Sequence, residues 1–330
     1  MKNKGKVLAL IILIVILLGV MILSLAIGAK SFSFSSMIEA LFTQNEGFEI
    51  SVIQQRLPRT VFGVLAGASL AVSGCLMQTI TRNPIADPGI LGVNSGAALF
   101  VVCGISFFHI SHPVSYIALG FLGALLTSFL VYGIASSGMG ATPLKLVLAG
   151  AAVSITMQSF ISMITLPNTQ VMDTFRFWQT GSISGADWTS VRSLLICFGI
   201  GMIVSLILAH SLNMISLGDE LATGLGVHVQ KIRALAALAG VLLCASVTAL
   251  AGPIAFVGLM IPHVMRLLVG NNMFFLLPFS AIAGGILLLI SDILGRILLA
   301  PSQLEVGIVT ALLGAPVFIW IVRKARVKGL

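Results

Sequence analysis

Charged side chains are scarce in this chain of 330 residues. Asp, Glu, Lys and Arg together make up 8% of it, whereas hydrophobic residues make up 58%. A soluble globular domain carries roughly a quarter of its residues as charged groups. The scarcity therefore excludes an ordinary soluble domain and predicts an all-α membrane protein that crosses the bilayer many times.

Features that would indicate a disulfide scaffold or an enzyme are also missing. The four cysteines, Cys75, Cys103, Cys197 and Cys244, stand singly within apolar runs and show no paired spacing. The nearest approach to a phosphate-binding loop begins at Gly28, but it lacks the required glycine directly before Lys30. We expect no nucleotide hydrolysis, no catalytic residues, and no cofactor or metal bound by this chain.

Apolar runs are what the sequence has in abundance. A membrane helix needs about 20 apolar residues to cross the hydrocarbon core. By this criterion the sequence predicts about ten transmembrane helices in a single domain, residues 1–330: 7–27, 61–80, 90–108, 114–134, 146–166, 194–212, 234–251, 254–269, 277–300 and 306–322. The eighth is short and follows Gly252-Pro253 directly, so it is a candidate half-helix or re-entrant piece.

The net charge of +8 is explained by the bilayer and not by nucleic acid, because the basic residues cluster at helix ends. With ten spans and cytoplasmic termini, twelve basic residues lie inside and six outside, as the positive-inside rule favours. The inner set is Lys2, Lys4, Lys6, Arg82, Lys145, Lys231, Arg233, Arg266, Arg323, Lys324, Arg326 and Lys328; the outer set is Lys30, Arg56, Arg59, Arg176, Arg192 and Arg296.

The stretch from Arg56 to Gly96 holds the most unusual pattern. A polar turn with Pro84 and Pro88 separates two apolar runs, which predicts a helical hairpin because neither proline fits a regular helix interior. Small residues recur in the first run at three- to four-residue spacing and allow another helix backbone to approach closely: Gly63, Gly67, Ala71 and Gly74. Gln78 either lines a polar path or forms interhelical hydrogen bonds.

This stretch resembles the signature of the FecCD-like permeases, the membrane subunits of ATP-driven importers for iron-siderophores, haem and cobalamin. The matching residues are Arg56-Leu57-Pro58-Arg59, Ser73-Gly74, Gln78, Arg82-Asn83-Pro84, Ala86-Asp87-Pro88, Leu91-Gly92 and Gly96-Ala97. Further matches lie at Gly252-Pro253-Ile254, Ile261-Pro262-His263 and Gly314-Ala315-Pro316.

The resemblance implies a fold like that of the cobalamin-importer permease, in a bacterial cytoplasmic membrane. It implies a second permease subunit, two cytoplasmic ATPases that hold ATP and Mg, and an extracytoplasmic binding protein. Ferric siderophore is the expected substrate, with haem or cobalamin as the alternative. The rival class is an ion-coupled secondary transporter, which needs an ionisable relay within the membrane; Asp292 and His263 are its few candidates here.

By the same resemblance, three arginines are expected to contact the binding protein: Arg56, Arg59 and Arg296. Extracytoplasmic segments are expected at residues 29–58 and 167–190, the first with a short amphipathic helix at the membrane interface. Asp292 and Arg296 stand four residues apart on one predicted helix, so a mutually satisfied ion pair is the alternative to docking for Arg296.

Residues 213–233 match the family's cytoplasmic coupling segment, which docks on the ATPase. The matching residues are Gly218, Asp219, Glu220, Ala222, Leu225 and Gly226. The two acids are expected in a first helical turn, where the helix dipole favours them. Thr142 and Pro143 become candidates for the inner gate by the same resemblance; from the residues alone they are a helix start with proline in its first turn.

Overall fold

The computed structural model describes residues 3–28, 32, 47–110, 113–137 and 142–326. Most of these residues lie in helices, and no strand occurs among them. The longer helices are α1 (Asn3–Ala26), α3 (Phe48–Thr81), α4 (Val93–Phe108), α5 (Pro113–Ala135), α6 (Pro143–Thr165), α8 (Trp188–Ile215), α10 (Val229–Ala251), α11 (Val257–Val269), α12 (Met273–Leu298) and α13 (Val306–Arg326). Three short elements join them: η1 (Pro88–Leu91), α7 (Thr169–Gln179) and α9 (Asp219–Gly224).

Each of the ten predicted spans coincides with one of the long helices. Seven of these are long and apolar enough to cross a membrane: α1, α3, α5, α6, α8, α10 and α12. The apolar helices α4 and α11 have 16 and 13 residues, so at 1.5 Å per residue they rise about 24 and 20 Å, less than the ~30 Å hydrocarbon core. The expectation of a short eighth helix after Gly252-Pro253 is therefore confirmed.

Helix α3 is the centre of the bundle and packs against α1, α8, α10, α11 and α12. The glycines predicted to allow close approach do so. Gly67 lies directly against the backbone of Gly284 on α12, and Gly74 lies against the backbone of Gly258 on α11. A methyl group at either position would collide with backbone atoms that cannot move aside, so these two contacts set how closely the helices pack.

The predicted turn after α3 is present. Arg82 ends the helix in the left-handed conformation, with φ 49° and ψ 32°. Pro88 then opens η1, whose first turn is capped by the Asp87 carboxylate accepting from the Gly89 amide at 2.8 Å. The two prolines thus stand outside the long helices, as their missing N–H groups require.

The expected outer segment 29–58 is corrected in its second half. Helix α3 begins at Phe48 and takes Pro58 into its interior. Burial explains this early start: Ile50 and Ile53 pack with Leu25 of α1 and with Phe32. The interfacial helix expected between Phe32 and Phe42 falls, apart from Phe32, outside the described residues. In the other outer segment, the structure forms α7, which the sequence reading did not foresee.

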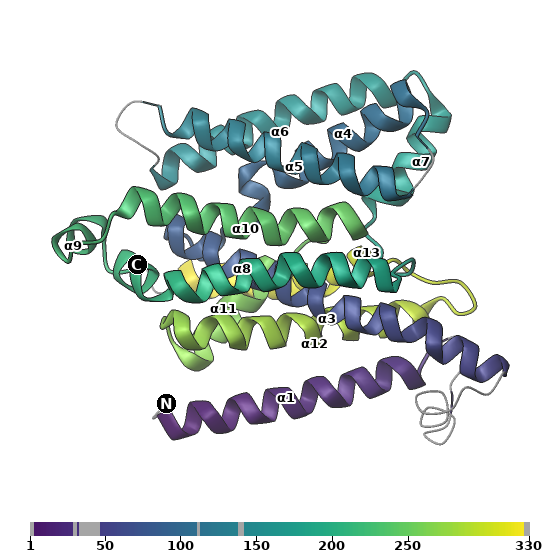
Figure 1. Ribbon diagram of the computed structural model, residues 1–330, viewed down its shortest axis with the longest axis horizontal. Helices are drawn as coiled ribbons and strands as arrows, with labels where there is room; N and C mark the ends of the chain where they lie inside the picture. The colour runs from purple at the N-terminus through teal and green to yellow at the C-terminus, as the bar shows by residue number, and fades with distance from the viewer. Residues whose placement is uncertain (1–2, 29–31, 33–46, 111–112, 138–141, 327–330) are drawn as a thin grey trace.

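The elements divide between two ends of the bundle (Figure 1). The first turn of α1, the last turn of α13 and α9 lie at one end, which we call the α9 end. Helix α7, the start of α3 and the connection from α12 to α13 lie at the opposite end, called the α7 end. Both chain termini and the predicted coupling segment therefore share one side.

Candidate functional site

The predicted coupling segment forms the short helix α9 between α8 and α10. Gly218 precedes it with φ 136°, a conformation that glycine adopts and other residues avoid, and Asp219 and Glu220 occupy its first turn as expected. Gly226, with φ 84°, turns the chain back toward α10. Ala222 is fully buried and packs with Ile215 and Val229.

The outward face of α9 is apolar. Leu221 and Leu225 are exposed, and so is Leu217, just before the helix. Glu220 is exposed beside them. Large apolar side chains left open at the end of a membrane protein, next to an acidic group, form a surface suited to a groove on another protein.

Asp219 faces the opposite way, toward the transmembrane helices, and contacts two arginines. The Nη2 atom of Arg233 lies 3.1 Å from its Oδ1 and 3.2 Å from its Oδ2. Arg82 forms a second ion pair with the Oδ1 atom. Arg233, on α10, has a side chain only 1% exposed, whereas the side chains of Arg82 and Asp219 are 36% and 44% exposed.

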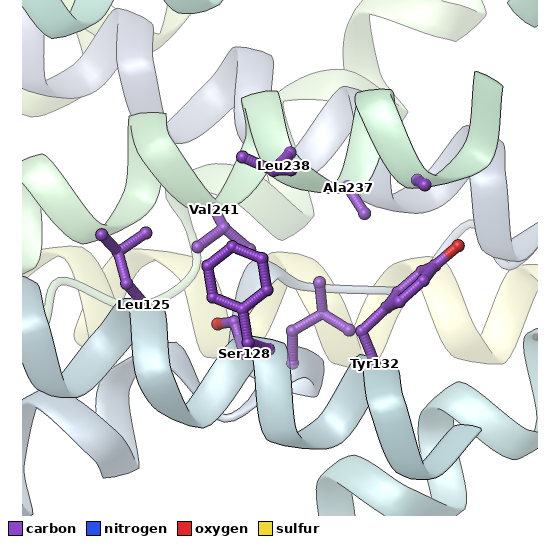
Figure 2. Close-up of a pocket in the computed structure, with 9 residues that line it drawn as sticks. Leu125, Ser128, Tyr132, Ala237, Leu238 and Val241 are labelled. Carbon is purple, nitrogen blue, oxygen red and sulfur yellow. The ribbon is translucent and has the colours of Figure 1, made fainter. Parts of the chain in front are cut away.

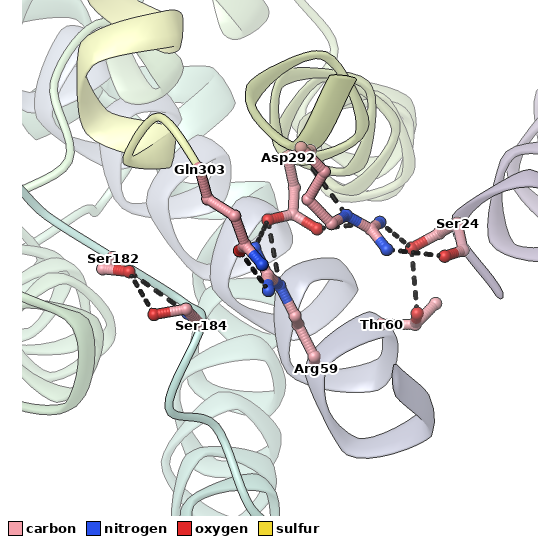
Figure 3. Close-up of polar contacts among 8 residues, drawn as sticks. Ser24, Arg59, Thr60, Ser182, Ser184, Asp292 and Gln303 are labelled. Atoms are coloured by element: carbon pink, nitrogen blue, oxygen red, sulfur yellow. Dashed lines mark hydrogen bonds and ion pairs between the residues drawn. The ribbon is translucent and has the colours of Figure 1, made fainter. Parts of the chain in front are cut away.

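A second aspartate between two arginines lies near the α7 end (Figure 3). Asp292 of α12 is 2% exposed; its Oδ1 accepts from Arg59 of α3 at 2.7 and 3.1 Å, and its Oδ2 lies 2.9 Å from Nη2 of Arg296. Arg59 also donates to Gln303 at 2.8 Å. Arg296 donates to the backbone carbonyl and the hydroxyl of Ser24 at 2.9 and 2.8 Å, which ties α1 into the cluster.

These contacts separate the three arginines assigned to docking. Arg296 is 3% exposed, and its guanidinium donates to Ser24 inside the protein, so this arrangement gives its docking assignment no support. The mutually satisfied pair with Asp292, the alternative reading of the spacing, is what the structure contains. Arg59 and Arg56 lie at the α7 end. The Arg59 side chain is 13% exposed and its guanidinium nitrogens are engaged by Asp292 and Gln303. Arg56 is half-buried, donates to the Leu25 carbonyl at 2.9 Å and lies over the Phe32 ring.

Gln78 is a packing residue in this structure. It is 2% exposed, and its amide nitrogen donates to the carbonyls of Gly258 and Leu259 at 3.3 and 3.0 Å. Its amide oxygen accepts from Arg266 at 3.2 Å. Of the two sequence readings for Gln78, the structure contains interhelical hydrogen bonding, which joins α3 to α11.

The gate candidates stand at the start of α6. Thr142 is the exposed N-cap residue, with its hydroxyl accepting from the Lys145 amide at 3.4 Å, and Pro143 occupies the first turn. Further along the same helix lies an open groove that the sequence reading missed, lined by Ile155, Gln158, Ser159, Ser162, Met163 and Leu166. The groove is mainly apolar, and the Ser159 hydroxyl donates to the Ile155 carbonyl of its own helix. The exposed Gln158 amide on an apolar helix suits a water-filled path or another subunit better than lipid.

A cavity of about 200 Å³ lies between α5 and α10 and is unsuited to a polar cargo (Figure 2). Leu125, Val241, Ala237 and Leu238 give it an apolar wall, and Tyr132 closes one side. Since a charged or strongly polar chelate finds almost no hydrogen-bonding group there, this cavity is not the substrate site.

Arg82 and Arg233 are the functional candidates that sequence reasoning did not identify as such. From the sequence, Arg233 was only a member of the basic inner set, and Arg82 was in addition part of the Arg82-Asn83-Pro84 match to the family signature. A signal was present for Arg233, since a cation follows the α9 segment and begins an apolar run in which each unpaired charge would be costly. Nothing in the sequence identified Asp219, fourteen residues earlier, as its partner.

The bundle of apolar helices, the exposed groove on α6 and the projecting α9 indicate a helical membrane transport subunit. Residues 13–324 match the FecCD transport family, and the chain belongs to that family. It is accordingly a permease subunit of an ATP-binding-cassette importer. The multi-span, all-helical fold and the family predicted from the signature are both confirmed.

Relatives align along nearly the whole chain. The Fe(3+)-citrate import system permease protein YfmD of Bacillus subtilis is 41% identical and covers 98% of this chain and 97% of its own. The ferric enterobactin transport system permease protein FepD of Escherichia coli is 42% identical over 96% of this chain and 95% of its own. The hemin transport system permease protein HmuU of Yersinia pestis is 35% identical over 96% and 94%.

Solved structures agree on the fold. An ABC transporter assigned to the metal-chelate type, in an inward-facing conformation, superposes with a TM-score of 0.84 at 31% identity and covers 97% of this chain and 99% of that one. PsaBC from Streptococcus pneumoniae has the same general fold, with a TM-score of 0.61 at 16% identity over 87% and 94% of the two chains.

Proposed function

We propose that this permease carries a ferric chelate, of the siderophore or ferric citrate kind, across the cytoplasmic membrane. The names of relatives support the proposal, because those at 41% and 42% identity import ferric citrate and ferric enterobactin. The hemin permease, at 35% identity, makes haem the next candidate.

In the proposed assembly, two permease subunits enclose a path, two cytoplasmic ATPases bind and hydrolyse ATP with Mg, and a binding protein delivers the chelate from outside. The α9 end is the cytoplasmic end. The bias of basic residues toward that end supports this orientation, and the exposed Leu217, Leu221 and Leu225 supply an apolar surface for the ATPase.

Substrate movement is proposed along the α6 groove, between two permease subunits. Gln158, Ser159 and Ser162 provide hydrogen-bonding groups that bind varied cargo weakly. Thr142 and Pro143 stand at the opposite end of α6 from Leu166, on the α9 side, and are the proposed inner gate. Alternating access follows when movement of α9 opens or closes that end of α6.

Docking of the binding protein is proposed at Arg56, and at Arg59 when its contact with Gln303 opens. A guanidinium group holds a carboxylate through two parallel hydrogen bonds, which suits recognition of acidic residues on the binding protein. Arg56→Glu replaces attraction by repulsion at a half-buried position and is expected to abolish uptake at normal protein levels, measured as binding-protein affinity and iron uptake. Arg176→Glu, which alters an exposed arginine on α7, is the comparison; unchanged affinity in Arg56→Glu would remove the docking assignment.

The experiment that tests the function is uptake of radiolabelled iron into cells expressing the whole importer. Ferric citrate, ferric enterobactin and hemin are supplied in turn, with ATP depletion in one arm and a protonophore in another. We expect uptake of a ferric chelate that stops on ATP depletion and survives the protonophore. Uptake of hemin alone would assign haem as the cargo, and uptake that follows the proton gradient would indicate a secondary transporter.

A further inference from the structure

Helix α9 is too short to be held by its own packing. It has six residues, and Ala222 is its one buried side chain. Ala222 packs with Ile215 and Val229, which lie at the adjoining ends of α8 and α10. Polar contacts between Asp219 and the two arginines add to this packing.

The same arginines cap the ends of two long helices. The last carbonyl groups of a helix have no partner within it. The Nε atom of Arg82 donates to the Ile215 carbonyl at the end of α8 at 3.1 Å. The Nε atom of Arg233 donates to the Ile80 carbonyl at the end of α3 at 3.2 Å. Each guanidinium therefore bonds a helix end with one edge and Asp219 with another.

We propose that Arg82 and Arg233 are positioning residues that make α9 move as one body with the end of α3. The inference rests on the proposed function, in which the exposed face of α9 contacts the ATPase. Displacement of α9 by the ATPase then reaches α3 through Asp219 and Arg82. Charge-assisted hydrogen bonds in a partly buried site are shorter and stronger than neutral ones, so they transmit the displacement better than one small apolar contact.

A route onward from the end of α3 is present. Gln78 lies one turn before Arg82 and joins α3 to the Gly258 and Leu259 carbonyls of α11 and to the Arg266 guanidinium. Movement of the end of α3 is therefore shared with α11. In this proposal the exposed leucines at α9 contact the ATPase, whereas Asp219 connects α9 to the ends of α3 and α10.

Arg82→Gln tests this role, because it removes the direct contact between Asp219 and the C-cap of α3. The variant leaves Asp219 in contact with Arg233, which still donates to the Ile80 carbonyl. The complete importer is reconstituted in liposomes with ferric citrate or ferric enterobactin, whichever the binding protein holds. We expect normal co-purification of the ATPase but at least about fivefold less iron transported per ATP hydrolysed. A factor of about five is the low end of the usual coupling between two sites of one protein. Arg82→Lys, which keeps the charge, should restore part of the ratio.

Lys4→Gln is the matched control, since it removes an exposed basic residue from the first turn of α1, at the same end of the bundle, and should leave both readouts unchanged. Hydrogen exchange on the purified permease gives a second measurement, in which Arg82→Gln should speed exchange of the α9 amides. Unaltered iron per ATP together with unaltered exchange would overturn the inference and leave the proposed function standing. Loss of ATPase binding in Arg82→Gln would also overturn it, by making Arg82 part of the docking surface. An ATPase that fails to co-purify with the unmodified chain would overturn the proposed function itself.

Discussion

The two aspartate clusters share one composition and differ in burial. Asp219 and Asp292 each lie between two arginines, one contributed by α3 or its C-cap and the other almost fully buried on a second helix. Arg59 and Arg82 are separated by about 35 Å along α3 at 1.5 Å per residue. The Asp292 side chain is 2% exposed, whereas that of Asp219 is 44% exposed.

This difference indicates different roles. A closed cluster cannot lose one member without leaving a charge away from water, so it fixes α1, α3 and α12 in one arrangement. An open cluster can let water replace a lost partner, so its contacts can shift with the helix that carries them. The cluster at the α7 end therefore fixes the positions of its helices, whereas the cluster at the α9 end allows α9 to shift.

Asp292→Ala should have the largest effect on stability. Removing it leaves Arg296 buried without its carboxylate and Arg59 with one partner fewer, and breaking a buried pair in this way costs about 3–5 kcal/mol. The measurement is thermal unfolding of the purified permease in mild detergent. Asp173→Ala breaks an exposed pair with Arg176 and should change stability by about 0–1 kcal/mol. Similar melting temperatures for the two variants would contradict the closed nature of the Asp292 cluster.

Asp219→Ala should destabilise the permease less, by about 1–3 kcal/mol, because Arg82 is exposed enough to be hydrated and Arg233 keeps the Ile80 carbonyl. Its effect on transport should nevertheless exceed its effect on folding. Protein yield and melting temperature are compared with iron transported per ATP in the same preparation, and Asp219→Glu is included as the conservative variant. A loss of transport no greater than the loss of folded protein would make the two clusters equivalent.

Asp187→Ala should have a smaller effect than either cluster variant and sets the scale for an exposed aspartate that caps a helix. Hydrogen bonds from the Ser190 hydroxyl and backbone amide hold the pKa of Asp187 below its usual value. A lowered folded-state pKa stabilises the protein above the unfolded-state value, so removal of this N-cap should cost about 0.5–1 kcal/mol near pH 7. The difference from the unaltered chain should shrink as the pH falls below about 3.9. A difference that grows on acidification would refute this account.

Much of the fold could be predicted from the lengths of the apolar runs. Each of the ten predicted runs became a helix, because a bilayer leaves backbone groups no partner except those within the helix. The start of α3 was misplaced, since Pro58 suggested a boundary and the burial of Ile50 and Ile53 against Leu25 could not be seen in one dimension. Helix α7 was missed because an 11-residue amphipathic helix gives little signal beside membrane spans.

Only part of the site could be predicted, because contacts between distant parts of the chain cannot be seen in the sequence. The residues of α9 were found because they are contiguous and match a signature. Arg233 and Arg82 were missed as partners of Asp219 because the contact joins three separate parts of the chain. Arg296 was assigned to the surface because neither its residue type nor its motif reveals that α1 covers it. In the structure, Ser24 of α1 accepts a hydrogen bond from Arg296.

The sequence by itself determined that this protein is an all-helical membrane permease of its family, because apolar runs and closely spaced motifs are local properties. Only the tertiary structure decided which charges face one another and which remain open to water. Those outcomes depend on how α1, α10 and α12 pack around α3, and that packing is set by close backbone contacts such as Gly67 with Gly284.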